Sequence, residues 1–156
     1  MKKLFVIFMM FASANAFAQW TYKTVDSPFD GSFKKAYAYS RGGGAVMLED
    51  GGHVRSSGGY YYPYLIITDG YFCNSESLIE FVFVVDGQNK KYDGIGYING
   101  DKDALIIDSY IWNPDFESDF KNASKLFVRV NNDVCDDDYY EVNMSGSTAA
   151  YNFIIK

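Results

Sequence analysis

Two cysteines are the residues whose type and number most directly predict a covalent bond in this chain. Cys73 and Cys135 are its two cysteines. In an oxidising compartment an even pair usually forms a disulfide, which here would close a loop of about 60 residues and contribute roughly 4 kcal/mol. A metal site and a reactive thiol are the alternatives, but a metal held by two cysteines needs further ligands. We therefore expect a disulfide between Cys73 and Cys135.

The single histidine, His53, stands in a glycine-rich turn and is the first candidate for acid–base chemistry. A catalytic histidine needs an orienting acid and a nucleophile within reach. Neither is signalled in the neighbouring sequence, and the Gly-x-Ser-x-Gly elbow of many hydrolases is missing from the chain. We expect an exposed loop histidine, no catalytic residue and no cofactor.

Carboxylates gather near the C-terminal end of the chain. Hard oxygen ligands grouped on one loop suit calcium, although the EF-hand spacing and its central glycine are missing. Such runs are more often solvated turns, so we assign no metal and keep calcium as a candidate. Asp101 and Asp103 form a smaller pair. A carboxylate pair for glycoside hydrolysis stays open, because it depends on a separation in space. The calcium candidate comprises Asp133, Asp136, Asp137, Asp138 and Glu141.

Tyrosine is abundant, with 14 residues in the chain, and many of them could lie at the surface. Exposed Tyr and Trp rings beside carboxylates can stack on sugar rings or anchor a protein partner. β-Sheets also favour aromatic residues, so packing accounts for most of these rings. The run from Tyr60 to Tyr64 differs, because consecutive strand residues point to opposite faces and cannot all be buried against one core. The candidate contact surface is Tyr60, Tyr61, Tyr62, Tyr64 and Trp112.

The elements that must position these residues are mostly short strands separated by turns. Asp-Gly and Asn-Gly between apolar runs are the strongest local hairpin signals, and they join 78–85, 91–98 and 104–110 into a predicted antiparallel meander. The run 78–85 is apolar almost throughout, which indicates a strand covered on both faces. Further strands are predicted at 20–25, 33–40, 45–48, 53–55, 64–68, 125–130 and 140–144, with 45–48 and 53–55 paired across Asp50-Gly51-Gly52.

Helical patterns occur twice. Asn113 can cap a helix that starts at Pro114, and Phe116, Phe120 and Ala123 then form one buried stripe that ends near residue 124. The segment 147–155 fits either an edge strand or a short helix after a Ser147 cap, and we favour the helix. Together these elements predict a mainly β, antiparallel β-sandwich-like single domain with one or two short helices.

The N-terminus has the pattern of an export signal. Lys2-Lys3 precedes the apolar run Leu4–Ala12, and Ala16-Phe17-Ala18 matches a signal peptidase site. A membrane span needs about 20 apolar residues, and this run is shorter. We expect residues 1–18 to be removed and 19–156 to form one domain, periplasmic or secreted, with no membrane insertion after cleavage.

The net charge of the chain indicates which classes of partner it does not bind. The formal net charge is −6, and the leader contributes two lysines, so the mature domain is more acidic still. A surface of this kind is repelled by phosphate backbones and by anionic lipids. Nucleic acid is therefore not an expected partner.

Three segments resemble small exported bacterial proteins. They are Trp20 with Asp26-Ser27-Pro28-Phe29-Asp30, the run Phe120–Arg129 and the run Val142–Ala150. In these segments the chain resembles the invasion-associated locus B family and the similar periplasmic proteins found with type VI secretion. The resemblance implies a β-sandwich-like domain with a terminal helix packed on a sheet, an accessory or envelope role, and no catalytic residues. The segment 42–59 and the tyrosine run depart from that pattern.

These observations favour a non-enzymatic exported domain that binds another envelope or secreted protein. Two other functions stay open. One is a glycan-binding module that uses exposed Tyr and Trp rings, and the other is a small hydrolase with an Asp/Glu pair.

Overall fold

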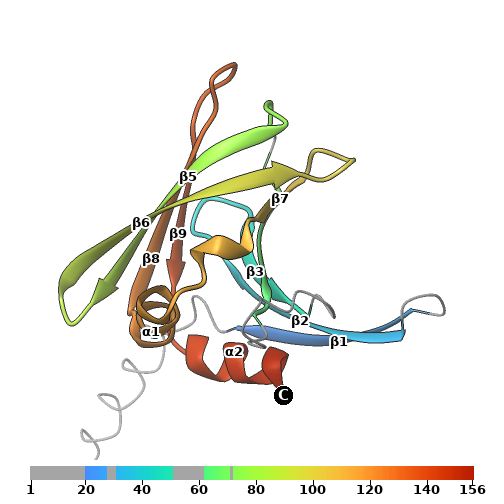
Figure 1. The fold of residues 1–156 in the computed structure, drawn as a ribbon, viewed down its shortest axis with the longest axis vertical. Coiled ribbons are helices and arrows are strands. Elements are labelled where there is room, and N and C mark those ends of the chain that lie inside the picture. Colours follow the sequence, from blue (N-terminus) through green and yellow to red (C-terminus); the bar gives the residue numbers. More distant parts are fainter. Residues whose placement is uncertain (1–19, 28–30, 51–61, 71) are drawn as a thin grey trace, which may run out of the picture.

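The computed structural model describes residues 20–27, 31–50, 62–70 and 72–156 of the chain. In these residues nine strands form one antiparallel sheet, in the order β1-β2-β3-β4-β7-β6-β5-β8-β9. The sheet bends strongly, so that β1 and β2 run across one end of β5, β8 and β9 (Figure 1). Its concave side holds the core, and the helices α1 and α2 lie together at the end next to β1 (Figure 1).

The elements have the following bounds. The strands are β1 (Thr21–Ser27), β2 (Gly31–Tyr39), β3 (Ala45–Glu49), β4 (Tyr64–Thr68), β5 (Glu76–Val85), β6 (Gln88–Ile98), β7 (Ala104–Ile107), β8 (Lys125–Asn131) and β9 (Asp138–Asn143). The helices are the 3-10 turn η1 (Ser109–Ile111), α1 (Pro114–Asn122) and α2 (Ser147–Ile155). The expected fold class, a mainly β, antiparallel β-sandwich-like single domain with one or two short helices, is confirmed: the strands form one bent antiparallel sheet, and two short α-helices pack on it.

The meander predicted around β5 is present, but its burial differs from the prediction. The strands β5, β6 and β7 are neighbours in the sheet, as the turns indicated. Ile79, Phe81 and Phe83 of β5 are fully buried, whereas Leu78 is 63% exposed. The expectation that this strand is covered on both faces is therefore wrong. The helix α1 packs on one face of the sheet, and the outward residues of β5 stay uncovered.

Small residues on the concave side make room for large ones. A Cβ atom at Gly96 of β6 would lie 3.0 Å from Ile79 and 3.2 Å from Ile107. Ala36 and Ala38 of β2 are fully buried where α2 packs on that strand. Because the interior is close-packed, added side-chain volume at these positions would force strands or helices apart.

Helix α1 begins as the sequence predicts. The Asn113 side chain accepts a hydrogen bond from the Phe116 N–H at 2.9 Å, and Phe116 and Phe120 are buried. The helix ends at Asn122. At this end, the Ser147 and Thr148 hydroxyls of α2 donate hydrogen bonds to the Lys121 carbonyl at 3.2 and 2.7 Å. These bonds satisfy an end carbonyl that the helix itself leaves free.

The C-terminal segment 147–155 is the helix α2, as favoured over an edge strand. The expected cap is wrong, because Gly146 occupies the N-cap position with φ +90° and Ser147 is the first helical residue. The Ser147 hydroxyl is used instead in the contact with α1.

The last strand meets the turn between β2 and β3. The Arg41 N–H donates to the Glu141 carbonyl at 3.0 Å, and the Glu141 N–H donates to the Ser40 hydroxyl oxygen at 3.1 Å.

Strand β3 pairs with β2 along one edge and with β4 along the other, so both edges of β3 are occupied. The hairpin predicted between 45–48 and 53–55 is therefore wrong, since the strand partner is Tyr64–Thr68; residues 53–55 lie outside the described residues.

A disulfide joins Cys73 to Cys135, as predicted, and links the connection before β5 to the connection before β9. The described residues contain no helix of sufficient length and apolar character to cross a membrane. The leader 1–18 and His53 lie outside the described residues, so the predictions made for them stay predictions.

Candidate functional site

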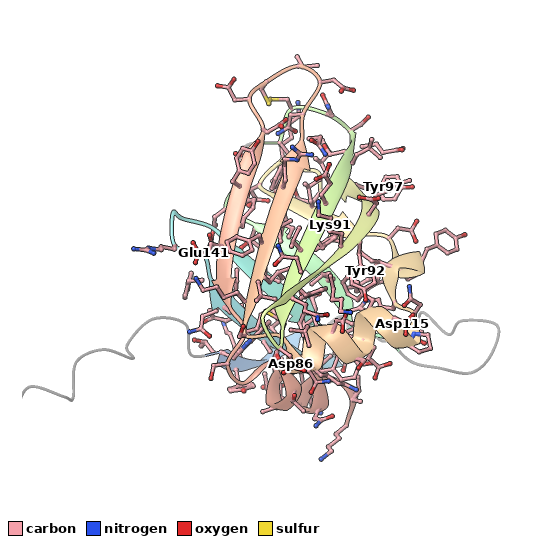
Figure 2. The ribbon with its side chains drawn as sticks, turned by 90° about the vertical axis from the view of Figure 1, so that its left-hand side faces the viewer. Asp86, Lys91, Tyr92, Tyr97, Asp115 and Glu141 are labelled. Carbon is pink, nitrogen blue, oxygen red and sulfur yellow. A yellow bond between two sulfur atoms is a disulfide. The ribbon has the colours of Figure 1, made fainter. Side chains whose placement is uncertain are left out.

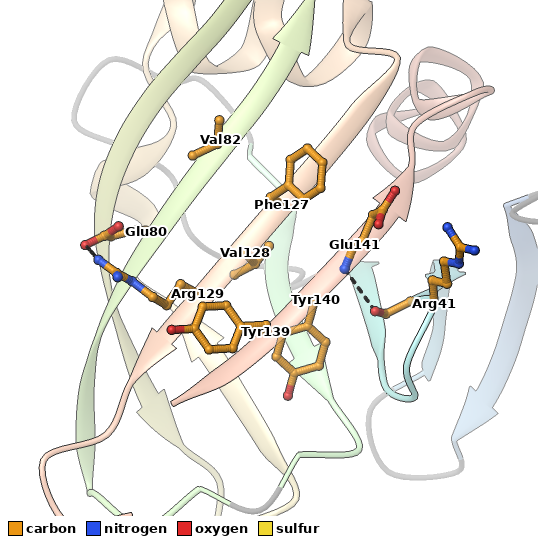
Figure 3. Close-up of a pocket in the computed structure, with 10 residues that line it drawn as sticks. Arg41, Glu80, Val82, Phe127, Val128, Arg129, Tyr139, Tyr140 and Glu141 are labelled. Carbon is orange, nitrogen blue, oxygen red and sulfur yellow. Dashed lines mark hydrogen bonds and ion pairs between the residues drawn. The ribbon is translucent and has the colours of Figure 1, made fainter. Parts of the chain in front are cut away.

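The outer face of β5, β8 and β9 carries a hollow of about 430 Å³, which we call the outer hollow (Figure 3). The strand register sets its two rows of outward side chains. One row runs Tyr139–Arg129–Glu80, and the next runs Glu141–Phe127–Val82. The hollow is lined by Ser40, Arg41, Glu80, Val82, Phe127, Val128, Arg129, Tyr139, Tyr140 and Glu141.

Aromatic and apolar side chains form the uncovered part of this site. Tyr139 is 68% exposed and Phe127 is 38% exposed, on neighbouring strands and in neighbouring rows. On the same face of β5, Leu78 lies two residues before Glu80 and is exposed. Large rings and an aliphatic side chain that are left in water in this way are the usual anchors of a binding surface.

Ion pairs hold the charged side chains around these rings. Arg129 pairs with Glu80 across β8 and β5, and its pKa is raised by hydrogen bonds to Glu80 and Tyr139. Lys125 pairs with Glu141 at 2.7 Å, and this bond lowers the pKa of the Glu141 carboxyl. Both pairs are partly exposed, so they orient the site more than they stabilise the fold.

Arg41 lines the hollow because the β2–β3 turn, which carries it, is hydrogen-bonded to β9. Its main chain is fixed by the bond to Glu141, and its exposed guanidinium also helps to lower the Glu141 pKa. Among the described residues it forms no ion pair within 4.0 Å. Arg41 therefore offers the hollow a planar, permanently charged donor group for a ligand.

One residue of the predicted tyrosine and tryptophan surface, Trp112, is not at the surface. Trp112 is 5% exposed, so its place in a contact surface is wrong: the chain turns inward after η1 and buries the ring against Phe116 and Phe120. Tyr62 is half-buried and stacks on Trp112 with an interplanar angle of 4°. Tyr64 is also half-buried, in β4, while Tyr60 and Tyr61 lie outside the described residues.

Three of the five acidic residues proposed for calcium interact with other parts of the fold. The Asp137 carboxylate accepts from the Asn132 N–H at 3.1 Å, and Glu141 is paired with Lys125. Burial raises the pKa of Asp138, which is turned into the fold. In the residues that the structure describes, no three His, Cys, Asp or Glu side chains are grouped to hold a metal ion. Asp133 and Asp136 are exposed, and Asp101 and Asp103 lie on the turn before β7.

The outer hollow was not predicted from the sequence. The alternation of Phe127 and Arg129 with buried Leu126, Val128 and Val130 did indicate that β8 has an outward face. The contribution of Ser40 and Arg41 had no local signal, because they reach β9 across a hundred residues of sequence. Comparison with protein-family models, with curated proteins and with solved structures finds no match to this chain.

Proposed function

We propose that this chain is an exported, non-enzymatic accessory domain that binds another envelope or secreted protein through the outer hollow. The observation that carries the proposal is the group of uncovered rings, Phe127 and Tyr139, between the pairs Glu80–Arg129 and Glu141–Lys125. Aromatic residues and arginine are enriched at the centres of protein interfaces. Charged pairs at the rim of such a patch select the partner and its orientation.

The state of the carboxylates favours binding over hydrolysis. A general acid in glycoside hydrolysis needs a raised pKa. The pKa of Glu141 is instead lowered by Lys125, and Glu80 is engaged by Arg129. A carboxylate with a lowered pKa and a second one paired with an arginine suit recognition of a partner better than proton transfer.

A glycan is the second candidate ligand, and Tyr139 is the observation that favours it. Its ring is 68% exposed beside Arg129 and Glu80, which could bind sugar hydroxyls while the ring stacks on a sugar face. A glycan array probed with the mature domain, and with a Tyr139→Ala variant as control, separates the two candidates. Binding that Tyr139→Ala abolishes would favour the glycan.

Export and a periplasmic or secreted location form part of the same proposal. The disulfide supports it, because such bonds persist in oxidising compartments. The resemblance to small exported bacterial proteins also implies an envelope role.

Site-specific photocrosslinking in the native host tests the protein-partner proposal. A photoreactive phenylalanine analogue replaces Phe127 or Tyr139 in separate variants, and the same analogue at Ile155, 38% exposed on α2, is the matched control. We expect one adduct of discrete mass from positions 127 and 139 and none from 155. Equal labelling at all three positions, or no adduct at 127 and 139, contradicts the proposal.

A further inference from the structure

One edge of β6 has no strand partner over most of its length among the described residues. β6 spans Gln88–Ile98, yet β7 pairs with it only at Gly96, Tyr97 and Ile98. The Asp108 N–H still donates to the Ile95 carbonyl at 2.8 Å, and the chain then leaves the sheet to form η1. In the described residues, the part of β6 before Ile95 therefore has a strand partner on one side, β5, and none on the other.

The main-chain groups that face this open edge follow from the alternation of the ladder. Groups on residues two apart point to the same side in an antiparallel strand. Because the Ile95 carbonyl faces the β7 side, the N–H and C=O groups of Asp93 and Lys91 face that side as well. Figure 2 shows Lys91, Tyr92 and Tyr97 along β6, with Asp115 on the nearby α1.

A cavity of about 230 Å³ lies at this edge, where η1 turns away from β6, and we call it the edge cavity. Asp93 and Asp108 supply two carboxylates to its lining, and the Tyr110 ring beside them is 90% exposed. None of the described residues that line it is basic. The lining is Tyr92, Asp93, Gly94, Ile95, Asp108, Tyr110, Ile111 and Asn113.

The walls of the edge cavity are fixed by internal hydrogen bonds. Asp108 accepts from the Tyr110 N–H at 3.1 Å, which holds the turn, and the Tyr92 hydroxyl donates to Asp119 at 2.5 Å. A carboxylate beside an exposed tyrosine ring suits a guanidinium or ammonium group, which both attract.

We propose that an extended segment of a partner protein adds to β6 as an antiparallel strand beside Lys91 and Asp93, with a basic side chain at the edge cavity. The inference rests on the proposed function in one respect, namely that the partner is a protein. Strand addition uses main-chain hydrogen bonds for affinity and side-chain sites for specificity. Here the basic residue lies opposite Asp93 and an acidic residue lies opposite Lys91.

The direction of the added strand fixes the order of these charges. In an antiparallel pair the residue opposite Asp93 precedes the residue opposite Lys91 by two positions. The segment therefore reads basic, apolar, acidic from N- to C-terminus, with the middle side chain turned toward the opposite face. Lysines on an exposed edge normally prevent unspecific pairing. At Lys91 the same charge makes the edge selective for a segment that carries the acidic residue in register.

Two peptides of identical composition test this register. The first is acetyl-Ser-Thr-Arg-Val-Glu-Val-Thr-amide, and the second exchanges its Arg and Glu. Binding to the isotopically labelled domain is followed by NMR, through the amide shifts and hydrogen-exchange protection of Lys91 and Asp93. We expect the exchanged peptide to bind roughly tenfold more weakly, because both exposed charge pairs turn from attraction to repulsion. Equal affinity for the two peptides overturns the proposed register.

Variants of the domain complete the experiment. The double variant K91D/D93K should prefer the exchanged peptide, and Asp108→Asn, which keeps the acceptor for the Tyr110 N–H, should weaken binding of the first peptide. Lys91→Pro removes an outward N–H without touching the β5 ladder and should abolish protection at the edge. Shifts confined to residues 127–141 would place the peptide in the outer hollow, and no shift at Lys91 and Asp93 overturns strand addition. Neither result bears on the crosslinks at positions 127 and 139, so the two proposals fail separately.

Discussion

The Tyr140 ring lies against the backbone of Gly44, and this contact fastens β9 to the start of β3. A Cβ atom at Gly44 would lie 2.6 Å from Tyr140 Cε1 and 2.7 Å from the Thr68 carbonyl oxygen. Gly44 also has φ +72°, in the region that side chains disfavour. Gly44→Ala should therefore lower the free energy of unfolding by about 2–4 kcal/mol, from backbone strain and overpacking together. Urea unfolding followed by tyrosine and tryptophan fluorescence measures the change.

The two preceding glycines provide matched controls for this variant. Gly43 has φ +106° with no atom within 4 Å of an added Cβ, so Gly43→Ala should cost only the strain, about 1–2 kcal/mol. Gly42 has neither constraint, and Gly42→Ala should stay within about 0.5 kcal/mol of the parent. If all three variants lose the same stability, the Tyr140 contact is not what holds β9 to the turn.

The disulfide should account for much of the stability of the domain. It joins residues 62 positions apart, and closing a loop of that length constrains the unfolded chain by about 4 kcal/mol. The double variant C73S/C135S should lose a comparable free energy of unfolding, and the native parent should show no thiol that reacts with Ellman's reagent. A parent with two titratable thiols, or a variant as stable as the parent, would contradict the prediction.

Local sequence signals predicted the elements because each signal acts within a few residues. The Asn113 side chain caps α1 through an atom three residues away, and Asp86-Gly87 turns β5 into β6 over two residues. The disulfide could be predicted just as directly, because two cysteines allow a single pairing. The helix α2 was harder to predict, because its pattern fitted a strand as well and its cap is provided by Gly146 instead of Ser147.

The candidate site could not be predicted in the same way, because it depends on how the sheet bends. Arg41 reaches Glu141 only after β9 has met the β2–β3 turn, and nothing near either residue signals the contact. Trp112 was expected at the surface but is buried by the path of the chain after η1. The apolar run of β5 indicated two covered faces, yet Leu78 is exposed because the helices lie on the opposite face. Periodicity gives the two faces of a strand, and only the fold decides which of them is covered.

Asp138 should make the stability of the domain depend on pH. Within the described part of the chain, its Oδ2 atom and Oδ1 of Asn132 are buried without a hydrogen-bond partner, and burial raises the pKa of the Asp138 carboxyl more than hydrogen bonding to Asn132 lowers it. A raised pKa in the folded state penalises the charged form, so the penalty is absent below the unfolded pKa and complete above the folded one. Asp138→Asn supplies an N–H donor that Asn132 can accept.

The variant Asp138→Asn should therefore gain stability at pH 7, on the order of 1 kcal/mol, since two unpaired buried acceptors are relieved. The gain should fade as the pH drops through the folded pKa and should vanish below the unfolded value near 3.8. Thermal unfolding of parent and variant between pH 3 and pH 8 measures it. Asp136→Asn, an exposed change on the connection just before β9, should show no such trend. A gain that is independent of pH would exclude the carboxylate as its cause.

Trp20 makes the position of the expected leader cleavage important for folding. It is 3% exposed, its ring centroid lies 5.9 Å from that of Phe120, and it packs near Gly146 ahead of α2. Trp20→Ala should cost about 3–5 kcal/mol by leaving a cavity between α1 and the N-terminal strand. Trp20→Phe should cost only about 1–2 kcal/mol, because the Trp20 Nε1 atom has no hydrogen-bond partner among the residues that the structure describes. A mature chain that starts at Gln19 should fold and one that starts at Thr21 should behave like Trp20→Ala, as judged by urea unfolding of the purified proteins. If the chain that starts at Thr21 is as stable as the longer one, the ring does not contribute to the core in the way that its burial indicates.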